Sequence, residues 1–128
     1  MGNPAAKQGD MITASDMHQI QPPSSSPPTL VPHVFNGIID NGLCSSVLIM
    51  GCPAATVNST ATNMPPHIPS GGSFVNPPSN MATISSGSAT VMIGGQAAAR
   101  NGDPANTCND NGENDGGTII ASGTVMIG

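Results

Sequence analysis

The sequence predicts an all-β fold, a small pseudo-threefold cone or pyramid made of short β-strands and loops rich in proline and glycine. A strand-and-turn motif recurs along the chain, which is typical of repeat architectures. The 128 residues include 16 glycines and 13 prolines, so turns are frequent. No stretch combines a helical apolar period with helix caps. We therefore expect a single domain over residues 1–128.

The most complete copy of the motif spans residues 86–103, where a short strand and a glycine turn precede a segment of small residues. Its strand half recurs at residues 47–50 and 124–128, and its turn half recurs at residues 2–10 and 51–56. The first copy thus has only a turn half and the last only a strand half. Two complete units and one split unit predict a ring of three, in which the C-terminal strand lies beside the N-terminal turn.

Dense prolines divide the first half of the chain. Residues 11–32 lead into Gln21-Pro22-Pro23-Ser24-Ser25-Ser26-Pro27-Pro28. Because prolines lack the N–H that a strand ladder needs, we expect an extended surface loop there. Residues 33–50 return to strand character, interrupted by Asn36-Gly37 and Asp40-Asn41-Gly42, which suit tight hairpin turns.

The second half alternates in the same way. Residues 60–80 predict another proline-rich loop, and residues 81–93 predict a strand. Pro104-Ala105-Asn106 is the one place where a single helical turn is expected. Residues 109–117 are almost purely turn formers, and short strands at 118–120 and 124–127 complete the architecture.

The charge composition excludes several classes of partner. The chain has seven acidic and two basic residues, which gives a net charge of −5. Lys7 and Arg100 alone cannot form a phosphate-binding surface, so neither nucleic acid nor an anionic membrane surface is the expected partner. No apolar run approaches the ~20 residues of a spanning helix. The N-terminus lacks the features of a signal peptide, so a machine must carry the protein if it leaves the cytoplasm.

The three cysteines are expected to be reduced thiols, because their number is odd and no signal peptide is evident. Cys44 and Cys52 flank a predicted strand. Eight extended residues would hold them about 26 Å apart, beyond the reach of a disulfide unless the strand folds back. We interpret both as packing residues.

The turn halves contain three related tetrapeptides. They are Pro4-Ala5-Ala6-Lys7, Pro53-Ala54-Ala55-Thr56 and Ala97-Ala98-Ala99-Arg100, and Gly9-Asp10 and Gly102-Asp103 follow two of them. With this pattern the chain resembles the PAAR family, named for its proline-alanine-alanine-arginine repeat. The resemblance implies a sharp cone on the trimeric spike of a contractile injection system, such as type VI secretion or a phage-tail-like machine, with a metal ion near the point. Thr56 replaces the basic residue of the second copy, so the chain resembles a divergent member.

The candidate metal ligands follow the repeat. His18 lies eight residues after Asp10, His67 lies eight residues after the equivalent Ser59, and Cys108 lies five residues after the third turn half. A threefold arrangement would bring these loops together on the axis. Imidazole and thiolate are ligands that zinc prefers, and a structural site needs four of them.

His33 is the expected fourth ligand, supplied by the extra loop of the first unit, and Cys44 is its rival. The resemblance independently implies a metal held by histidines and a cysteine, with zinc expected and iron an alternative. Solvated loop histidines are the competing interpretation. A metal would also brace a chain with two phenylalanines, which can bury little apolar area.

Two further patterns involve the charged residues. A basic and an acidic residue lie three positions apart in the first unit (Lys7 and Asp10) and the third (Arg100 and Asp103), whereas the second has Thr56 and Ser59 at these positions. An ion pair or a charge-assisted bond within each charged unit would explain the spacing, and coincidence among three units is the alternative. Residues 110–115 are superficially similar to a calcium loop. They lack a glycine at the sixth position of that pattern and its distal glutamate, so a solvated turn is preferred.

No catalytic motif is present, so we expect a structural protein and not an enzyme. The expected function is to cap and sharpen the trimeric spike, one chain per trimer, with a metal-braced apex that punctures the target membrane transiently. Alone, the chain is expected to be a monomer. The alternatives are a free-standing zinc-binding or secreted effector protein with the same fold and, third, a phage-tail tip. With no appended domain expected after Gly128, a covalently attached toxin is not expected, and noncovalent cargo remains open.

Overall fold

The computed structural model describes residues 2–69, 71–108 and 116–128. Within these ranges the chain forms strands and no helix, as the sequence predicts. The strands are β1 (Asn3–Pro4), β2 (Met11–Gln21), β3 (Thr29–Asn41), β4 (Cys44–Ile49), β5 (Cys52–Ala54), β6 (Thr60–Asn63), β7 (Ser73–Phe74), β8 (Met81–Ile84), β9 (Met92–Ile93), β10 (Gln96–Ala97), β11 (Pro104–Asn106), β12 (Gly117–Ile120) and β13 (Met126–Ile127).

The largest sheet closes on itself as a small barrel. Its strand order is β12-β11-β8-β6-β3-β2-β7, and β12 also pairs with β2, which completes the ring. The inner faces of these strands supply one hydrophobic core, whose largest fully buried side chains include Ile12, Phe35, Ile39, Ile84 and Ile119. Closure leaves no open edge between β12 and β2, which protects a sheet of such short strands from pairing with other chains.

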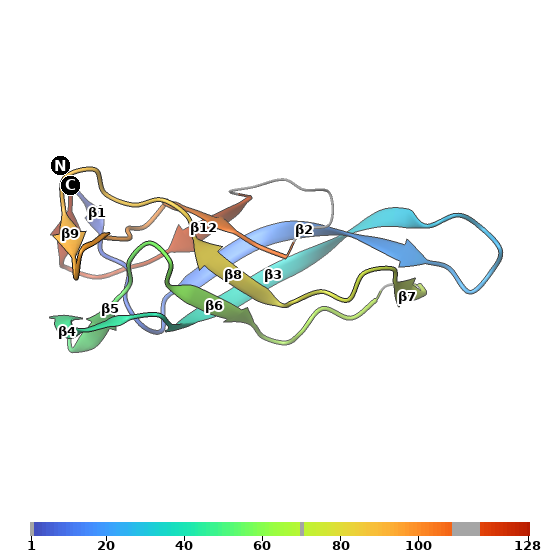
Figure 1. The fold of residues 1–128 in the computed structure, drawn as a ribbon, viewed down its shortest axis with the longest axis horizontal. Helices are drawn as coiled ribbons and strands as arrows, with labels where there is room; N and C mark the ends of the chain where they lie inside the picture. Colours follow the sequence, from blue (N-terminus) through green and yellow to red (C-terminus); the bar gives the residue numbers. More distant parts are fainter. Residues whose placement is uncertain (1, 70, 109–115) are drawn as a thin grey trace.

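A long hairpin of β2 and β3 projects from the barrel and forms one end of the molecule (Figure 1). The two strands pair without interruption from Met11 opposite Ile38 to Ile20 opposite Thr29. The expectation of a surface loop over residues 11–32 is therefore wrong, except for the proline-rich connection between the strands. Inward-facing Asp16 and His18 interrupt the apolar alternation of β2, which hid its period of two from a sequence reading.

Three other local expectations are also corrected. Asn36-Gly37 lies within β3 and is not a turn; a Cβ at Gly37 would approach the Phe35 ring to 2.6 Å, so glycine is needed there for packing. Pro104–Asn106 is strand β11 and not a helical turn. Residues 60–80 contain the strands β6 and β7, and residues 81–93 form β8 and β9 with a non-strand segment between them.

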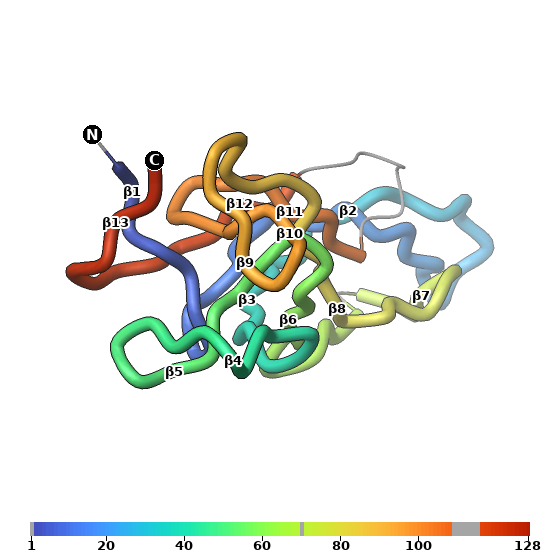
Figure 2. Tube along the Cα trace, turned by 60° about the vertical axis from the view of Figure 1, so that its left-hand side comes forward, coloured from blue at the N-terminus to red at the C-terminus, as the bar shows by residue number. Residues whose placement is uncertain are grey.

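Three two-stranded hairpins form the opposite end of the molecule, and each joins a strand half to a turn half. They are β4 with β5, β9 with β10, and β1 with β13. In the last pair Asn3 lies opposite Ile127, so the two ends of the chain complete one unit. Figure 2 brings this end of the molecule toward the viewer and shows the three pairs, β1 with β13, β9 with β10 and β4 with β5, arranged around it. The predicted split repeat and ring of three are confirmed.

A ring of backbone hydrogen bonds joins the three units. The amide of Ala6 donates to the carbonyl of Ala99 (2.9 Å), Ala99 donates to Ala55 (3.1 Å), and Ala55 donates back to Ala6 (3.1 Å). All three alanines are fully buried. Larger side chains would not fit where three strands approach one another so closely, which explains the small residues of the turn halves.

The spacing of charged residues has the expected cause. Lys7 pairs with Asp10 at 3.2 Å and Arg100 pairs with Asp103 at 2.9 Å. In the second unit the Ser59 hydroxyl replaces the carboxylate as the acceptor of an amide three residues earlier. The hypothesis of an ion pair within each charged unit is confirmed.

The solvated turn expected at residues 110–115 lies outside the described residues. No helix in the described part of the chain could cross a membrane. All three cysteines are free thiols. Cys44 and Cys52 are not held apart by an extended strand, because β4 turns back at Met50 and Gly51 to pair with β5.

Candidate metal centre

Four potential metal ligands from three separate segments meet inside the narrow half of the molecule. Asp16 and His18 come from β2, His67 from the segment between β6 and β7, and Cys108 from the residues after β11. One ligand atom from each lies within 4.8 Å of those of the others. Residues two apart on a strand share a face, so β2 directs both Asp16 and His18 inward, where each is fully buried.

Asp16 lies at the middle of the hydrogen-bond network. Its Oδ2 atom accepts from His67 Nε2 (3.0 Å) and from the Cys108 thiol (3.3 Å), and its Oδ1 atom accepts from the Thr107 hydroxyl. The Cys108 sulfur lies 3.7 Å from His18 Nε2. A buried carboxylate is costly unless it is hydrogen-bonded, and three donors meet that requirement here.

His33 lies directly beside this cluster, opposite Asp16 in the pairing of β2 and β3. The centre of its ring is 5.6 Å from that of His18 and 5.5 Å from that of His67. Its Nδ1 atom lies 2.9 Å from the carbonyl oxygen of Val31, which can only accept, so Nδ1 carries the proton. Its Nε2 atom then presents a lone pair, and this buried atom has no hydrogen-bond partner among the described residues.

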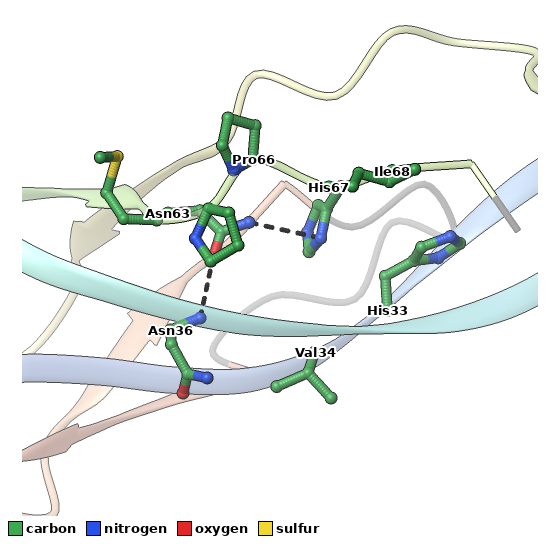
Figure 3. Close-up of a pocket in the computed structure, with 9 residues that line it drawn as sticks. His33, Val34, Asn36, Asn63, Pro66, His67 and Ile68 are labelled. Carbon is green, nitrogen blue, oxygen red and sulfur yellow. Dashed lines mark hydrogen bonds between the residues drawn. The ribbon is translucent and has the colours of Figure 1, made fainter.

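Aromatic and apolar groups surround the centre. The Phe74 ring lies 5.5 Å from the rings of both His18 and His33 and covers them from β7. On another side a pocket of about 290 Å³ is lined by His33, His67, Asn63 and apolar residues (Figure 3). Of the clustered donors His67 lines this pocket, while Asp16 and His18 are fully buried.

The thiol of Cys108 is in an unfavourable place for a free thiolate. Burial, and then the negative charge of Asp16 and a hydrogen bond to it, raise the pKa of the thiol to about 11. Without a metal the sulfur is therefore protonated at neutral pH. Binding of a cation would have to displace this proton, because the thiolate is the form that ligates.

The structure brings together His18, His67 and Cys108, and it places His33 beside them. Cys44 lies away from these residues, in β4, where it packs against the apolar cluster of the three two-stranded hairpins, which includes Ile49 and Ile93. Sequence reasoning missed Asp16. The spacing of Asp16 and His18 would have revealed it if residues 11–21 had been recognised as a strand, since alternate residues face the same side.

The residues present fit a bound metal ion in their chemistry. Nitrogen, sulfur and oxygen donors converge from three segments, and His33 offers a buried lone pair with no partner in the described chain. Imidazole with thiolate is a donor combination typical of zinc, and iron also accepts it. The donor atoms of Asp16, His18, His67 and Cys108 form the cluster, and the ring of His33 lies beside it.

Comparison with known proteins identifies a family for the chain. The family model described as PAAR motif matches residues 31–107, which is more than half of the chain and includes His33 and His67. Among curated proteins, none matches.

Proposed function

The chain belongs to the PAAR motif family, the family of type VI secretion spike-tip proteins, and we propose on this premise that it caps and sharpens the trimeric central spike of a contractile injection apparatus. The observation that carries this proposal is the ring of three equivalent hairpins at one end of the molecule. A pseudo-threefold face can meet a threefold spike with one chain per trimer. Its role is mechanical and requires no catalytic group.

The face formed by the three hairpins has the apolar character expected of a docking surface. A large side chain is exposed at the equivalent position of each strand half, namely Leu48, Met92 and Met126, with exposed fractions of 60%, 61% and 56%. The residues that follow them, Ile49, Ile93 and Ile127, point inward and are buried. Burial of the outward set against a spike would favour association.

The opposite, narrow end would be braced by one zinc ion in the donor cluster, with iron as the alternative. The ligands are proposed to come from the sequence-derived set, His18, His33, His67 and Cys108, together with Asp16. A bound ion would tie β2, the segment before β7 and the residues after β11 to one point. Such a crosslink stiffens a domain whose core is built largely from alanine and isoleucine.

The chain would remain in the cytoplasm until assembly and then occupy the tip of the apparatus, where contraction drives the narrow end into a target membrane. Effector cargo would be carried noncovalently. The alternative is a free-standing zinc-binding or secreted effector protein that uses the same fold. The apolar face at the hairpin end favours the tip, because a free-standing protein gains nothing from three exposed equivalent side chains.

Co-expression with the trimeric spike protein of the same cell tests the proposal. We expect a stable complex of one chain per spike trimer, measured by light scattering after size-exclusion chromatography. Elemental analysis of the same sample should give about one zinc per chain. Failure to form the complex would favour the free-standing alternative, and absence of metal from a well-formed complex would remove the brace without removing the docking function.

A further inference from the structure

We propose that the distal region of the long hairpin is a lipid-contact surface, which binds membranes of neutral lipids by burying exposed apolar side chains in one leaflet. The distal region comprises the end of the β2–β3 hairpin, residues 17–34, and the chain that packs beside it, residues 64–69 and 71–75. The inference rests on the proposed tip function for the direction in which the chain meets a membrane. It goes beyond that function, because a purely mechanical point needs no affinity for lipid.

The outer face of β3 is apolar where an exposed strand face is normally polar. Leu30, Pro32 and Val34 alternate with more buried residues and are all exposed, Leu30 by 44% and Val34 by 71%. On the β2 side, the amide of Val75 donates to the Gln19 carbonyl (3.0 Å), and the Val75 side chain is 43% exposed. An antiparallel sheet with one solvated face usually places polar residues on it. The apolar outer face of β3 is therefore typical of a surface that something else covers.

Exposed apolar side chains also lie on the other side of the hairpin. Ile68 is 74% exposed, and Figure 3 shows Val34 and Ile68 on opposite sides of the β3 ribbon. A docked protein would cover one of these sides, whereas a bilayer surrounds whatever enters it. The distribution over two sides therefore favours lipid over a protein partner.

The distal region contains no acidic residue, lysine or arginine. Between Met11 and Ile39 the one such residue is Asp16, which is fully buried and hydrogen-bonded, and residues 41–99 contain none. Charged side chains are costly in the hydrocarbon of a bilayer, so their absence suits entry. Anionic headgroups attract basic clusters, which are missing here, so the matching membrane surface is a neutral one.

The connection at the end of the hairpin limits the other cost of entry, that of unpaired backbone donors. Four prolines, which have no N–H, lie among its residues 22–28, and they are Pro22, Pro23, Pro27 and Pro28. The Gln21 side chain donates to the carbonyl oxygens of Ser26 (2.9 Å) and Pro22 (3.3 Å). From Val34 to Thr29, β3 extends about 17 Å, which matches about 15 Å of hydrocarbon in one leaflet.

Tryptophan quenching by brominated lipid tests this contact in the full chain. The protein has no tryptophan or tyrosine, so a single introduced indole is the only such reporter. Leu30→Trp places it in the distal region, and Met92→Trp is the matched control in β9, at the opposite end of the molecule. With vesicles of brominated neutral phosphatidylcholine we expect quenching in Leu30→Trp alone, unchanged by added salt. Equal quenching in both variants, or quenching in neither, would overturn the inference.

Val34→Asp separates lipid contact from docking to the spike. It places a charge on the outer face of β3, so we expect the partition coefficient into phosphatidylcholine vesicles, measured by flotation, to fall by about tenfold or more. Met92→Asp should partition as the wild type does but lose the spike complex. Normal partition of Val34→Asp would overturn the inference and leave the proposed docking intact.

Two further outcomes concern the wild-type chain. If it forms a dimer by light scattering and does not float with vesicles, a second copy covers the apolar face, and the inference is overturned. If it floats but forms no complex with the spike, the proposed docking fails while lipid contact stands.

Discussion

Asn3 and Ile127 lie opposite each other in the pairing of β1 with β13, so residues near the two ends of the sequence form one hairpin of the threefold base. The equivalent pairings are Ile49 with Cys52 and Ile93 with Gln96. Two of the three hairpins are therefore closed by a short turn, and one is closed only by noncovalent contacts. The threefold face depends on that third hairpin as much as on the other two.

The outward side chains of the three hairpins should determine docking to the spike. Replacement of Leu48, Met92 or Met126 by aspartate places a charge in the proposed apolar interface, and each change should weaken binding by about 1–2 kcal/mol, with the triple variant failing to form the complex. Because these side chains are exposed, the free protein should unfold at an unchanged denaturant concentration. The measurement is complex formation with the spike, followed by size-exclusion chromatography.

Val34→Asp is the matched control for these changes. Val34 is 71% exposed and lies in the middle of β3, away from the three two-stranded hairpins of the proposed docking face. This variant should therefore bind the spike normally. Equal loss of binding in Val34→Asp and Met92→Asp would contradict a docking face at the hairpins.

The uncharged second unit should not tolerate the carboxylate that its two counterparts carry. Ser59 is fully buried, and its hydroxyl donates to the Gly42 carbonyl (2.8 Å) while accepting from the Thr56 amide. In Ser59→Asp a carboxylate would face the Gly42 carbonyl with no cation nearby. We expect the free energy of unfolding to fall by about 3 kcal/mol, measured by denaturant titration.

The matched double variant Thr56→Lys with Ser59→Asp recreates the pair seen at Lys7 and Asp10. It should recover part of the lost stability, because the ammonium would neutralise the buried carboxylate. An unchanged stability in Ser59→Asp would show that the hydroxyl bond to Gly42 is not what selects serine in this unit.

The repeat was the part of the fold that the sequence predicted well. Local turn chemistry and small residues fix the hairpins, so the threefold ring and the pairing of the two chain ends could be inferred from the copies at residues 2–10, 47–56, 86–103 and 124–128. The long hairpin of β2 and β3 could not. Four of the five prolines between residues 22 and 32 lie in the connection at its tip, and Pro32 lies within β3 opposite Met17. The two strands are stabilised by pairing with each other, which local propensity does not report.

The same error affected the candidate site. Matching positions in the repeat correctly placed His18, His67 and Cys108 together, because a ring of three brings equivalent segments to one axis. Asp16 was missed because residues 11–21 were not recognised as a strand, which would have placed Asp16 on the same face as His18. Which atom of each ring carries the proton depends on neighbours such as Asn63, so it follows only from the assembled structure.

The thiols of Cys44 and Cys108 should differ in reactivity in metal-free protein. A hydrogen bond from Ser46 lowers the pKa of the Cys44 thiol, whereas burial raises that of Cys108 to about 11. At pH 8 only about 0.1% of Cys108 would be thiolate, and the fraction grows about tenfold for each pH unit up to its pKa. We expect iodoacetamide to modify Cys44 well before Cys108, measured by peptide mass spectrometry over time.

Cys108→Ser is the control that assigns the slow site. The rate at Cys44 should be the same in this variant, since β4 is remote from the metal centre. Modification of Cys108 at the rate of Cys44 at pH 8 would contradict the enclosed, carboxylate-flanked position of its sulfur.

The hairpin of β1 and β13 allows the strictest test of the threefold base. Deletion of residues 122–128 removes β13, exposes the edge of β1 and takes away Ile127, which is buried in the cluster of the hairpin end. It also removes the Gly128 carbonyl that accepts from Ser88 and Arg100. We expect the free energy of unfolding to fall by about 3–5 kcal/mol, with aggregation and no docking, although every candidate metal ligand is retained.

By contrast, a circular permutant that joins Gly128 to Gly2 through a short linker and opens the chain near Ser25 should fold, bind zinc and dock, because the join only adds a covalent turn to a hairpin that already exists. Thermal unfolding, zinc content and spike binding of the two proteins, measured side by side, decide the matter. A truncated chain that stays monomeric and docks, or a permutant that does not fold, would contradict closure of the ring by the last strand.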